Sequence, residues 1–590
     1  MMHSDSIIVT APIFENFGGW VLDTQFITTM GMPYLLAHGL GRPVEDAYVD
    51  FTTQEAGEYH LLVYTFNWVA PWQKKDAPGI FELHLDGQKI GPVFGCHAPQ
   101  WGWEQGGSVR LEKGSHRLSV RDLTGFDGRL GMVVLTQNPH PILPETPTQV
   151  TEFVLAHCCT AVDVEKTYDL VVCGGGMAGI CAALSASRNG LKTALIQDRP
   201  VVGGNNSSEV RVWLGGKTNF EPFPGIGNII NELEQSKVGH HGSTNQGENY
   251  EDDRKLALVR NQENLDLYLG HIMTDVQMKG DSIESITAWD YQGGQVLTIR
   301  GKLFSDCTGD ATLGAMAGAD FEVTTNGHMG ASNLWYAEEM AQPQPFPECP
   351  WAGDLRNCQF PGRKGVDQFG LTGLEAMGAW FWESGHEYDP IEKAEYIRDL
   401  NLRAMFGAWD TVKNVDGEYL NHAITFCSYI AGKRESRRLL GDVVLTKQDV
   451  QKGKYQEDGC VPSTWSFDVH YPDRRYYGAF HEGDAFLANA YYEHFDGPYF
   501  IPYRVMYSRN IANLFMAGRN VSVSHDALGT LRVMRTGGMM GEVVGYAAKY
   551  CRKYEILPRQ VYTDHLEEFI SELKSIPNRK HNKLVANERE

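Results

Sequence analysis

The chain has 590 residues, 42% of them hydrophobic and 21% charged, which is an ordinary globular composition with room for roughly three to four domains. The formal net charge of −22 argues against a nucleic-acid or anionic-membrane partner, because phosphate groups are bound by clustered lysine and arginine. No basic leader opens the chain and no run of about 18 apolar residues occurs, so we expect no membrane span and a cytoplasmic location. The 11 cysteines form no CxxC pair and no cluster has metal-ligand spacing, so we expect reduced thiols and no metal.

Residues 1–148 are predicted to form an all-β sandwich. They contain short apolar or alternating runs, separated by turns with Gly and Pro. The dipeptide Asp86-Gly87 lies between two such runs and predicts a hairpin turn. The predicted strands are Ala47–Thr52, Glu58–Phe66, Ile80–Leu85, Ser108–Leu111, His116–Arg121 and Gly131–Thr136.

This first region is also rich in tryptophan. Aromatic rings on a sandwich often stack on sugar rings, but they also fill cores and domain interfaces, and both alternatives stay open. The residues concerned are Trp68, Trp72, Trp101 and Trp103. The region is interpreted either as a glycan-binding module or as a part that covers an active site or forms a dimer.

A dinucleotide-binding unit is predicted to begin at Tyr168. An apolar strand over Tyr168–Cys173 is followed at once by a glycine-rich turn. A helix over Ile180–Arg188 and a second strand over Lys192–Gln197 come next. This β-turn-α-β order is typical of a Rossmann-like dinucleotide fold.

Each glycine of the turn Gly174-x-Gly176-x-x-Gly179 has a physical task. Gly174 allows the tight turn, Gly176 lets backbone N–H groups approach a pyrophosphate, and Gly179 lets helix and strand pack closely. The helix N-terminus directs the positive end of its dipole toward the phosphates. We therefore include Met177 and Ala178 at this N-terminus in the predicted cofactor site.

A carboxylate is expected about 20 residues after the glycines, where it would hold the ribose hydroxyls. That place falls on Gln197 or Asp198. Because an amide can also bond a hydroxyl, we assign the ribose contact to the pair.

Four later segments carry a resemblance. They are RPVVGGNNSSEVR (Arg199–Arg211), LFSDCTGDATLGAMAGAD (Leu303–Asp320), GKRESRRLLGDVVLT (Gly432–Thr446) and NLFMAGRNVSVSHDALGTLRVMRTGGMMGEVVGYAA (Asn513–Ala548). In this order they resemble the motifs of the FAD-dependent oxidoreductase family with a glutathione-reductase-like flavin-binding fold. The resemblance covers about residues 168–550 and implies FAD as the cofactor. The further cofactor residues that it implies are Arg199, Gly204, Asn205, Ser207, Thr308, Gly309, Asp310, Gly518, Arg519, Gly537, Gly538 and Met539.

The closing motif implies a glycine-led helix that points its N-terminus at the flavin. We expect this helix to begin near Gly537-Gly538, where its dipole would stabilise the anionic reduced ring. No second GxGxxG occurs, so a separate NAD(P)H domain is not expected. The loop that carries the redox cysteine pair in disulfide reductases has Asn205, Asn206 and Ser207 here, which argues against thiol chemistry.

The predicted architecture is an α/β flavin-binding domain with an inserted substrate domain, preceded by the sandwich. The divisions are 1–148 sandwich, 149–167 linker, 168–325 first part of the FAD-binding domain, 326–500 substrate or cap region, 501–575 closing part of the FAD-binding domain, and 576–590 polar tail. The linker rests on the Pro- and Thr-rich stretch Pro139–Gln149.

The catalytic candidates follow the last flavin motif. His525 can exchange a proton with an alcohol near the flavin, with Asp526 orienting it. Arg532 and Arg535 either bind an anionic or hydroxylated substrate, offset flavin charge, or pair with carboxylates in the fold. Arg434, with Arg437 and Arg438, is interpreted either as a substrate contact or as an ion-paired helix start.

An aromatic and histidine-rich wall is predicted between residues 464 and 504. Such a wall suits a sugar or planar ligand, and equally a domain interface. Its members are Trp465, His470, Tyr471, Tyr476, Tyr477, His481, Tyr491, Tyr492, His494, Tyr499 and Tyr503.

Three functions stay open at this point. The first is hydride transfer between FAD and a small polar substrate such as a carbohydrate alcohol, with His525 taking the hydroxyl proton. The second is an amine or carboxylate-substrate oxidase or a reductase of an activated double bond, with the arginines holding a carboxylate. The third is a glycan-binding module with a structural flavin. A homo-oligomer is compatible with all three.

Overall fold

The structure is a computed structural model and describes residues 6–73, 75–96, 99–453, 456–477, 485–495 and 497–579. The N-terminal strands are β1 (Ser6–Thr10), β2 (Val21–Asp23), β3 (Tyr34–Ala37), β4 (Ala47–Thr53), β5 (Gly57–Thr65), β6 (Phe81–Leu85), β7 (Gln88–Phe94), β8 (Gly102–Leu111), β9 (Gly114–Asp122) and β10 (Gly128–Thr136). They form two antiparallel sheets, in the orders β2-β3-β10-β5-β8, with β1 beside β10, and β4-β9-β6-β7. One buried core takes side chains from both sheets, among them Leu61 and Val133 from the first and Phe81 and Leu118 from the second.

The hairpin predicted at Asp86-Gly87 is present. β6 and β7 pair with Leu85 opposite Gln88, and the turn residues have φ of 50° and 83°. Positive φ at both central residues is what the favoured two-residue hairpin turn requires. The sequence prediction did not identify β1, β2 and β3, because these strands are short and lack clear alternation.

Residues 149–167 do not form the predicted linker. Helix α2 (Pro147–Cys158) begins after Thr146, and β11 (Thr160–Cys173) follows almost directly. The Thr146 side chain accepts a hydrogen bond from the Gln149 N–H, and the Gln149 side chain accepts one from the Thr146 N–H. This is a capping box with Pro at the first helical position. The Pro and Thr residues interpreted as a linker are therefore helix-start signals.

The α/β dinucleotide-binding fold predicted from Tyr168 onward is confirmed. β11 pairs in parallel with β12 (Thr193–Gln197) on one side and with β16 (Gln295–Asp306) on the other. The sheet continues through β13 (Leu265–Leu269) next to β12, and through β15 (Ser282–Asp290) and β14 (His271–Lys279) next to β16. The late strand β29 (Leu514–Met516) pairs in parallel with the end of β16, so the domain is built from two distant stretches.

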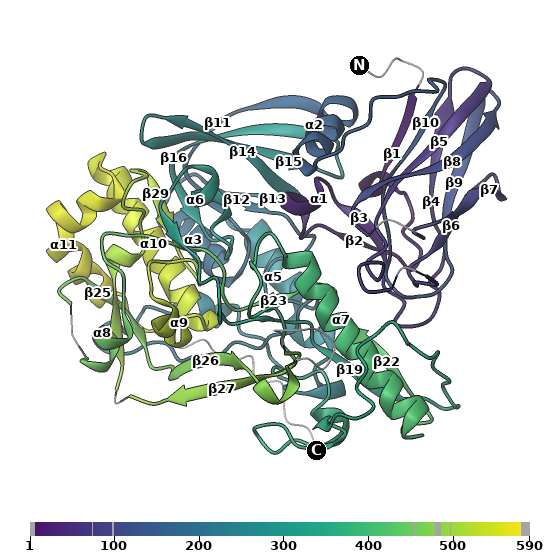
Figure 1. Ribbon diagram of the computed structural model, residues 1–590. Helices are drawn as coiled ribbons and strands as arrows, with labels where there is room; N and C mark the ends of the chain where they lie inside the picture. Colours follow the sequence, from purple (N-terminus) through teal and green to yellow (C-terminus); the bar gives the residue numbers. More distant parts are fainter. Residues whose placement is uncertain are drawn as a thin grey trace, which may run out of the picture.

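Helix α10 (Met534–Tyr554) lies directly on α3 (Met177–Arg188), the helix of the glycine motif (Figure 1). A side chain on Gly541 would collide with the Ala178 carbonyl, and one on Gly545 would collide with Ser185. The Ser185 hydroxyl donates to the Glu542 carbonyl at 2.7 Å. Glycine at these positions therefore allows the two helix backbones to touch.

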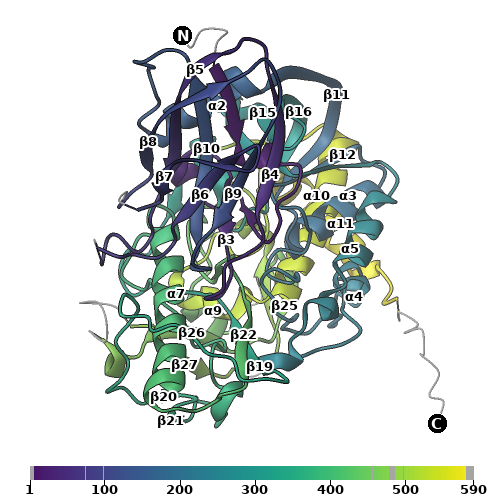
Figure 2. The ribbon, with the colours of Figure 1, turned by 90° about the vertical axis from the view of Figure 1, so that its right-hand side faces the viewer.

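The intervening region holds short two-stranded sheets and one long helix, α7 (Ala394–Asp410). Two views show α7, in green, beneath the N-terminal strands (Figures 1 and 2). The sheets are β17 (Phe321–Glu322) with β24 (Arg438–Leu439), β18 (Ala331–Ser332) with β23 (Gly432–Lys433), β19 (Trp335–Glu339) with β22 (His422–Cys427), β20 (Phe360–Pro361) with β21 (Lys364–Gly365), β25 (Gly459–Ser463) with β28 (Tyr499–Pro502), and β26 (Phe467–Pro472) with β27 (Ala488–Glu493). The remaining helices are α1 (Ile27–Met30), α4 (Asn228–Glu232), α5 (Asp252–Arg260), α6 (Thr312–Met316), α8 (Lys447–Gln451), α9 (His525–Leu531) and α11 (Pro558–Ser575).

The N-terminal tryptophans pack against the rest of the chain. Trp68 is fully buried in a core shared with Trp351 and Phe406. Trp101 donates its indole N–H to Glu395 at 2.9 Å, and the Trp72 ring packs on Tyr396 at a tilt. Trp103 donates to the Pro144 carbonyl at 2.9 Å. These contacts favour the domain-interface alternative over sugar stacking.

None of the helices in the part of the chain that the structure describes is both long and apolar enough to cross a membrane. The predicted tail is described only to residue 579, so most of it lies outside the described residues.

Candidate active site

A cavity of about 980 Å³ lies at the carboxyl ends of the parallel strands. Its wall includes the residues that directly follow β11, β12, β16 and β29, namely Gly174, Asp198, Cys307 and Ala517. In open α/β sheets, ligands bind at this edge.

The glycine motif opens one wall of this cavity. Gly174 has φ of +102°, which glycine adopts without strain, and Gly176 is the N-cap of α3. A Cβ at Gly176 would meet only the Cα of Gly204, at 3.8 Å, so the backbone of this turn is open to a ligand. Gly179 does not line the cavity; a side chain there would collide with the Gly174 carbonyl. Its role is the close helix–strand packing expected from the sequence.

The geometry favours Asp198 over Gln197 for the ribose contact. The Gln197 Oε1 accepts from the Gly175 N–H at 2.7 Å, and its Nε2 donates to the Val201 carbonyl at 2.8 Å. Both ends of the amide are therefore occupied by the loop itself. Asp198 lines the cavity, and its pKa is raised by burial, with Arg199 offsetting part of the effect.

A positively charged group surrounds Asp310. Lys433 and Arg519 contact its carboxylate at 2.7 and 3.0 Å, and Arg437 donates to its carbonyl at 2.7 Å. Burial raises the pKa of Asp310, but Lys433 and Arg519 outweigh it and hold that pKa far below its usual range. Three cations against one carboxylate leave two formal positive charges on the cavity wall. This charge complements a dinucleotide diphosphate.

Most predicted cofactor residues lie on this one wall. Those that line the cavity are Gly174, Gly176, Met177, Ala178, Gln197, Asp198, Arg199, Gly204, Asn205, Thr308, Gly309, Asp310, Gly518, Arg519 and Gly537. Four predicted residues do not line it: Gly179, Ser207, Gly538 and Met539. The Ser207 hydroxyl donates to the Gly204 carbonyl at 2.8 Å and thereby supports the loop from behind.

The closing helix begins earlier than predicted. α10 starts at Met534, after Val533 as its N-cap, so Gly537 and Gly538 lie within its first turns. Gly537 faces Gly518 across the cavity wall, where an added Cβ would lie 3.6 Å from the Gly518 Cα. Gly538 packs on Ile230, which leaves no room for a side chain. The two glycines thus allow neighbouring residues to pack closely against α10. The helix N-terminus that lines the cavity is Val533-Met534.

Two of the three catalytic candidates lie off the cavity wall. The His525 Nδ1 contacts both carboxylate oxygens of Glu435, at 2.8 and 3.0 Å. Arg535 donates to Asn231 at 2.9 Å and pairs with Glu234 at 2.7 Å, which matches the alternative of pairing within the fold. Neither residue lines the cavity, whereas Arg532 does. The catalytic role of His525 stays a prediction that this position does not favour.

A second charged cluster lies at the cavity, where β26 brings Asp468 and His470 to the wall. Arg434, Asp468, His470 and Arg532 line the cavity, and together with the fully buried Glu383 we call them the wall cluster. Arg434 pairs with Glu383 at 3.3 Å, and Arg532 pairs with Asp468 at 3.0 Å. His470 lies between the two carboxylates, with Nδ1 2.7 Å from Glu383 and Nε2 3.2 Å from Asp468.

The two carboxylates of the wall cluster stay ionised. Burial raises the pKa of Glu383, but Arg434 and His470 outweigh it and hold that pKa far below its usual range. Arg532 and His470 do the same for Asp468 against its burial. The Oδ1 of Asp468 is buried with His470 Nε2 3.2 Å away, whereas the Nε of Arg532 is buried and lacks a hydrogen-bond partner within the described chain. The cluster therefore offers an N–H donor to a ligand.

Part of the predicted aromatic wall is present. Trp465, His470, Tyr492 and His494 line the cavity, together with Trp213, Phe369, Trp380 and Phe381. Tyr499 and Tyr503 instead bond Thr530 and the Pro558 carbonyl in the core. His481 lies outside the described residues.

Sequence reasoning missed Asp468 and Glu383. The signal for Asp468 was its position two residues before His470, because alternate residues of a strand share a face. Glu383 had no such signal, since it lies far from the flavin motifs in the chain. Of the described residues, no group of three His, Cys, Asp or Glu has the arrangement of a metal site.

Comparison with known proteins agrees with this geometry. The model of the family described as FAD dependent oxidoreductase matches residues 169–573. The chain belongs to this family. The prediction of FAD as the cofactor is thereby confirmed, and the open glycine turn, the Asp198 carboxylate and the positive group around Asp310 fit it.

Individual relatives share only parts of the chain. An NADH:acrylate oxidoreductase of Vibrio harveyi is 30% identical over 147 residues, which are 24% of this chain and 13% of that protein. A geranylgeranyl bacteriochlorophyll reductase-like structure from Thermoplasma acidophilum is 12% identical, covering 69% of this chain and 84% of its own, with a TM-score of 0.31. A glycerol-3-phosphate dehydrogenase of Bacillus halodurans complexed with FAD is 13% identical, covering 32% and 42%, with a TM-score of 0.22.

Proposed function

We propose that this chain transfers hydride between FAD and a small polar substrate bound at the wall cluster. FAD supplies the hydride chemistry when bound, so the protein has to orient the substrate and move a proton. The observation that carries the proposal is His470, held on the cavity wall between Glu383 and Asp468.

His470 has the contacts of a proton carrier. Its Nδ1 is bound by the buried Glu383 carboxylate, which fixes the ring and the tautomer with the proton on Nδ1. The Nε2, 3.2 Å from the Asp468 carboxylate, is then the ring atom that we expect to exchange a proton with the substrate. A carboxylate behind the ring also stabilises the imidazolium that forms when Nε2 takes a proton, as in other carboxylate–histidine pairs. In an alcohol oxidation, Nε2 would accept the hydroxyl proton while the carbon-bound hydrogen leaves as hydride.

Charge balance supports a neutral hydroxylated substrate. The two arginines of the wall cluster are matched by two ionised carboxylates, so no full positive charge is left to hold an anion. The open N–H donor on Arg532 and the carboxylate of Asp468 beside it are complementary to hydroxyl groups. The rings of Trp465, Tyr492 and Phe381 supply flat apolar surface beside them. A carbohydrate or related alcohol is therefore the first candidate.

A second candidate is reduction of a double bond next to a carboxylate. The unpartnered Nε of Arg532 can donate to a carboxylate, and the relative from Vibrio harveyi is named for its action on acrylate. In this direction His470 would supply the proton instead of taking it.

Anaerobic flavin spectroscopy separates the two candidates. The oxidised protein is mixed with a panel of sugars and polyols, and the dithionite-reduced protein with acrylate and related unsaturated acids. Bleaching by an alcohol supports the first candidate, and reoxidation by an unsaturated acid supports the second. If the flavin responds to neither panel, while free FAD controls behave normally, the wall cluster is not a site for these substrates.

We also propose a revised domain division. Residues 1–146 would form a β-sandwich whose two sheets share one core. The former linker joins the next unit as α2 and the start of β11. The flavin-binding parts remain near 160–325 and 501–575, with the substrate region of 326–500 between them. Comparing the fragments from limited proteolysis with these boundaries tests the division.

A further inference from the structure

The N-terminal segment Thr24–Thr29 lies on the wall of the cofactor cavity. These residues directly follow β2 and line the cavity together with Asp198. Phe26 packs in one buried cluster with Ile272 and Tyr291. Ile272 also lines the cavity; burial raises the pKa of Tyr291, and the nearby charge of Asp198 adds to this effect. The segment is therefore close to the predicted ribose contact.

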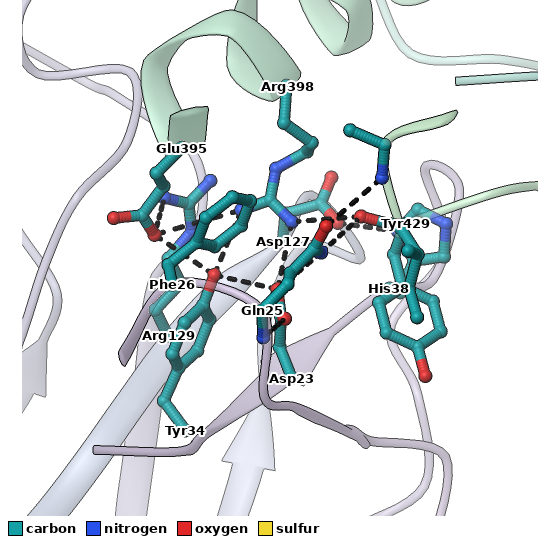
Figure 3. Close-up of polar contacts among 12 residues, drawn as sticks. Asp23, Gln25, Phe26, Tyr34, His38, Asp127, Arg129, Glu395, Arg398 and Tyr429 are labelled. Carbon is teal, nitrogen blue, oxygen red and sulfur yellow. Dashed lines mark hydrogen bonds and ion pairs between the residues drawn. The ribbon is translucent and has the colours of Figure 1, made fainter. Parts of the chain in front are cut away.

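A buried network of charges fixes this segment from behind (Figure 3). Arg398 on α7 pairs with Asp23 at 3.1 Å, and the Tyr34 hydroxyl donates to Asp23 at 2.8 Å. Arg129 on β10 pairs with Glu395 at 2.6 Å. Both arginine side chains are fully buried. Because separating buried charges is unfavourable, the network holds the N-terminal region on α7 in one position.

Gln25 connects this network to the cavity-lining chain (Figure 3). Its Nε2 donates to the Tyr429 carbonyl at 2.8 Å, and its Oε1 accepts from the Ala431 N–H at 3.0 Å. The residues from Ile430 to Arg434 line the cavity and include Lys433, which pairs with Asp310.

Tyr429 also connects this network to the residues beside the predicted ribose contact, Asp198. The Tyr429 hydroxyl donates to Glu209 at 3.4 Å, and Glu209 pairs with Arg199 at 3.0 Å. Arg199 follows Asp198 in the chain and lines the cavity beside it. A continuous set of polar contacts therefore runs from the N-terminal region to the residues around the ribose contact.

We propose that Thr24–Thr29 forms part of the binding site for the adenosine half of FAD. Gln25 is a positioning residue that holds this segment against the strand carrying Lys433. The N-terminal region is then an integral part of the cofactor site, not an appended module. This inference rests on the assignment of the cavity to FAD.

The first test is a titration of the full-length apoprotein with FAD and with FMN, which lacks the adenosine half, followed by flavin fluorescence. Gln25→Ala should weaken FAD binding about 10-fold and leave FMN binding unchanged. Gln25→Glu keeps the acceptor for the Ala431 N–H but sets a carboxylate against the Tyr429 carbonyl and Asp23, so it should not recover the loss. Gln88→Ala, at an exposed position on β7, is the matched control and should bind FAD like the parent. Equal losses for FAD and FMN would overturn the inference, because they would show a general defect.

The second test does not depend on affinity. Thr28→Cys and the matched Thr52→Cys both place a thiol at an exposed position of the N-terminal region. Maleimide labelling, read by peptide mass spectrometry, should become slower at position 28 when FAD is added and stay constant at position 52. Equal labelling of position 28 with and without bound FAD would overturn the inference. A parent protein that binds no FAD would instead remove the cofactor assignment itself.

Discussion

Two clusters of arginines and carboxylates lie in this molecule, and their chemistry is nearly the same. The interface network joins Arg129 and Arg398 to Asp23, Glu395 and Asp399, and none of these side chains lines the cavity. The wall cluster joins Arg434 and Arg532 to Glu383 and Asp468, but all of its members except Glu383 line the cavity, and it holds His470 between its carboxylates. Composition alone would not separate them. Access to the cavity and a histidine between the carboxylates are what lead us to propose a functional role for the wall cluster and a structural one for the interface network.

The largest expected effect is in the interface network. Arg398→Met leaves Asp23 and Asp399 buried with too few cations, and breaking such a group typically costs about 3–5 kcal/mol. We expect a large fall in the free energy of unfolding, measured in urea, or loss of soluble protein. Arg117→Met, which breaks an exposed pair with Asp50, should change stability little. A stable Arg398→Met protein with slow flavin chemistry would contradict the structural role that we give to the interface network.

In the wall cluster, the largest effect should come from His470. His470→Asn removes the basic Nε2 but keeps a donor near Glu383. Flavin reduction by the substrate should slow by about 100-fold to 10,000-fold, measured anaerobically by stopped flow, while FAD stays bound. The pH dependence of the remaining rate should also flatten. An unchanged rate constant would exclude His470 as the proton carrier.

Arg532 should affect substrate binding more than the chemical step. Arg532→Lys keeps the charge beside Asp468 but loses the planar fork and the open Nε donor. We expect KM to rise about 10-fold with a smaller change in kcat, because one charged hydrogen bond is lost. Arg535→Lys, off the cavity wall, is the control and should leave both constants unchanged. Similar behaviour of the two variants would argue against a substrate contact at Arg532.

Two histidines outside the two clusters, His386 and His38, should give the stability of the protein opposite pH responses. Burial lowers the pKa of His386, next to Glu383, to about 4, so below pH 6.5 the unfolded chain binds more protons and stability falls toward pH 4. Burial also acts on His38, but Asp127 outweighs it and raises its pKa to about 10, so its stabilisation is lost as pH rises from 6.5 to 10. His386→Asn should flatten the acid side of a Tm-against-pH curve, and His38→Asn the alkaline side. Flattening of the alkaline side by His386→Asn and of the acid side by His38→Asn would contradict the two pKa shifts.

The smallest expected effect is at His525. Its ring contacts Glu435 and does not line the cavity, so His525→Asn should cost some stability but leave flavin reduction within about twofold of the parent. Stopped-flow traces recorded beside those of His470→Asn give the comparison. A slow His525→Asn variant that still binds FAD would restore the original assignment and require a movement of α9.

The cofactor half of the site was predictable because its determinants are local. The glycines, Asp198 and the Asp310 turn each follow a strand, and parallel strands bring their carboxyl ends to one edge. The substrate half of the site was not predictable from the sequence, because Glu383 and His470 come from segments that only tertiary packing brings together. Closeness to the last flavin motif suggested His525, but α9 turns that ring toward Glu435.

The contact between α3 and α10 constrains how the protein is made. Gly541 touches Ala178 across 363 residues of chain, so the face of α3 has no cover until α10 has left the ribosome. At bacterial or eukaryotic elongation speeds of about 5–20 residues per second, that interval is roughly 20–70 s. During this time the nascent chain carries an exposed small-residue helix and half of a flavin cleft. Capture of the flavin therefore has to wait until α10 has been made, when the two parts of the domain first meet.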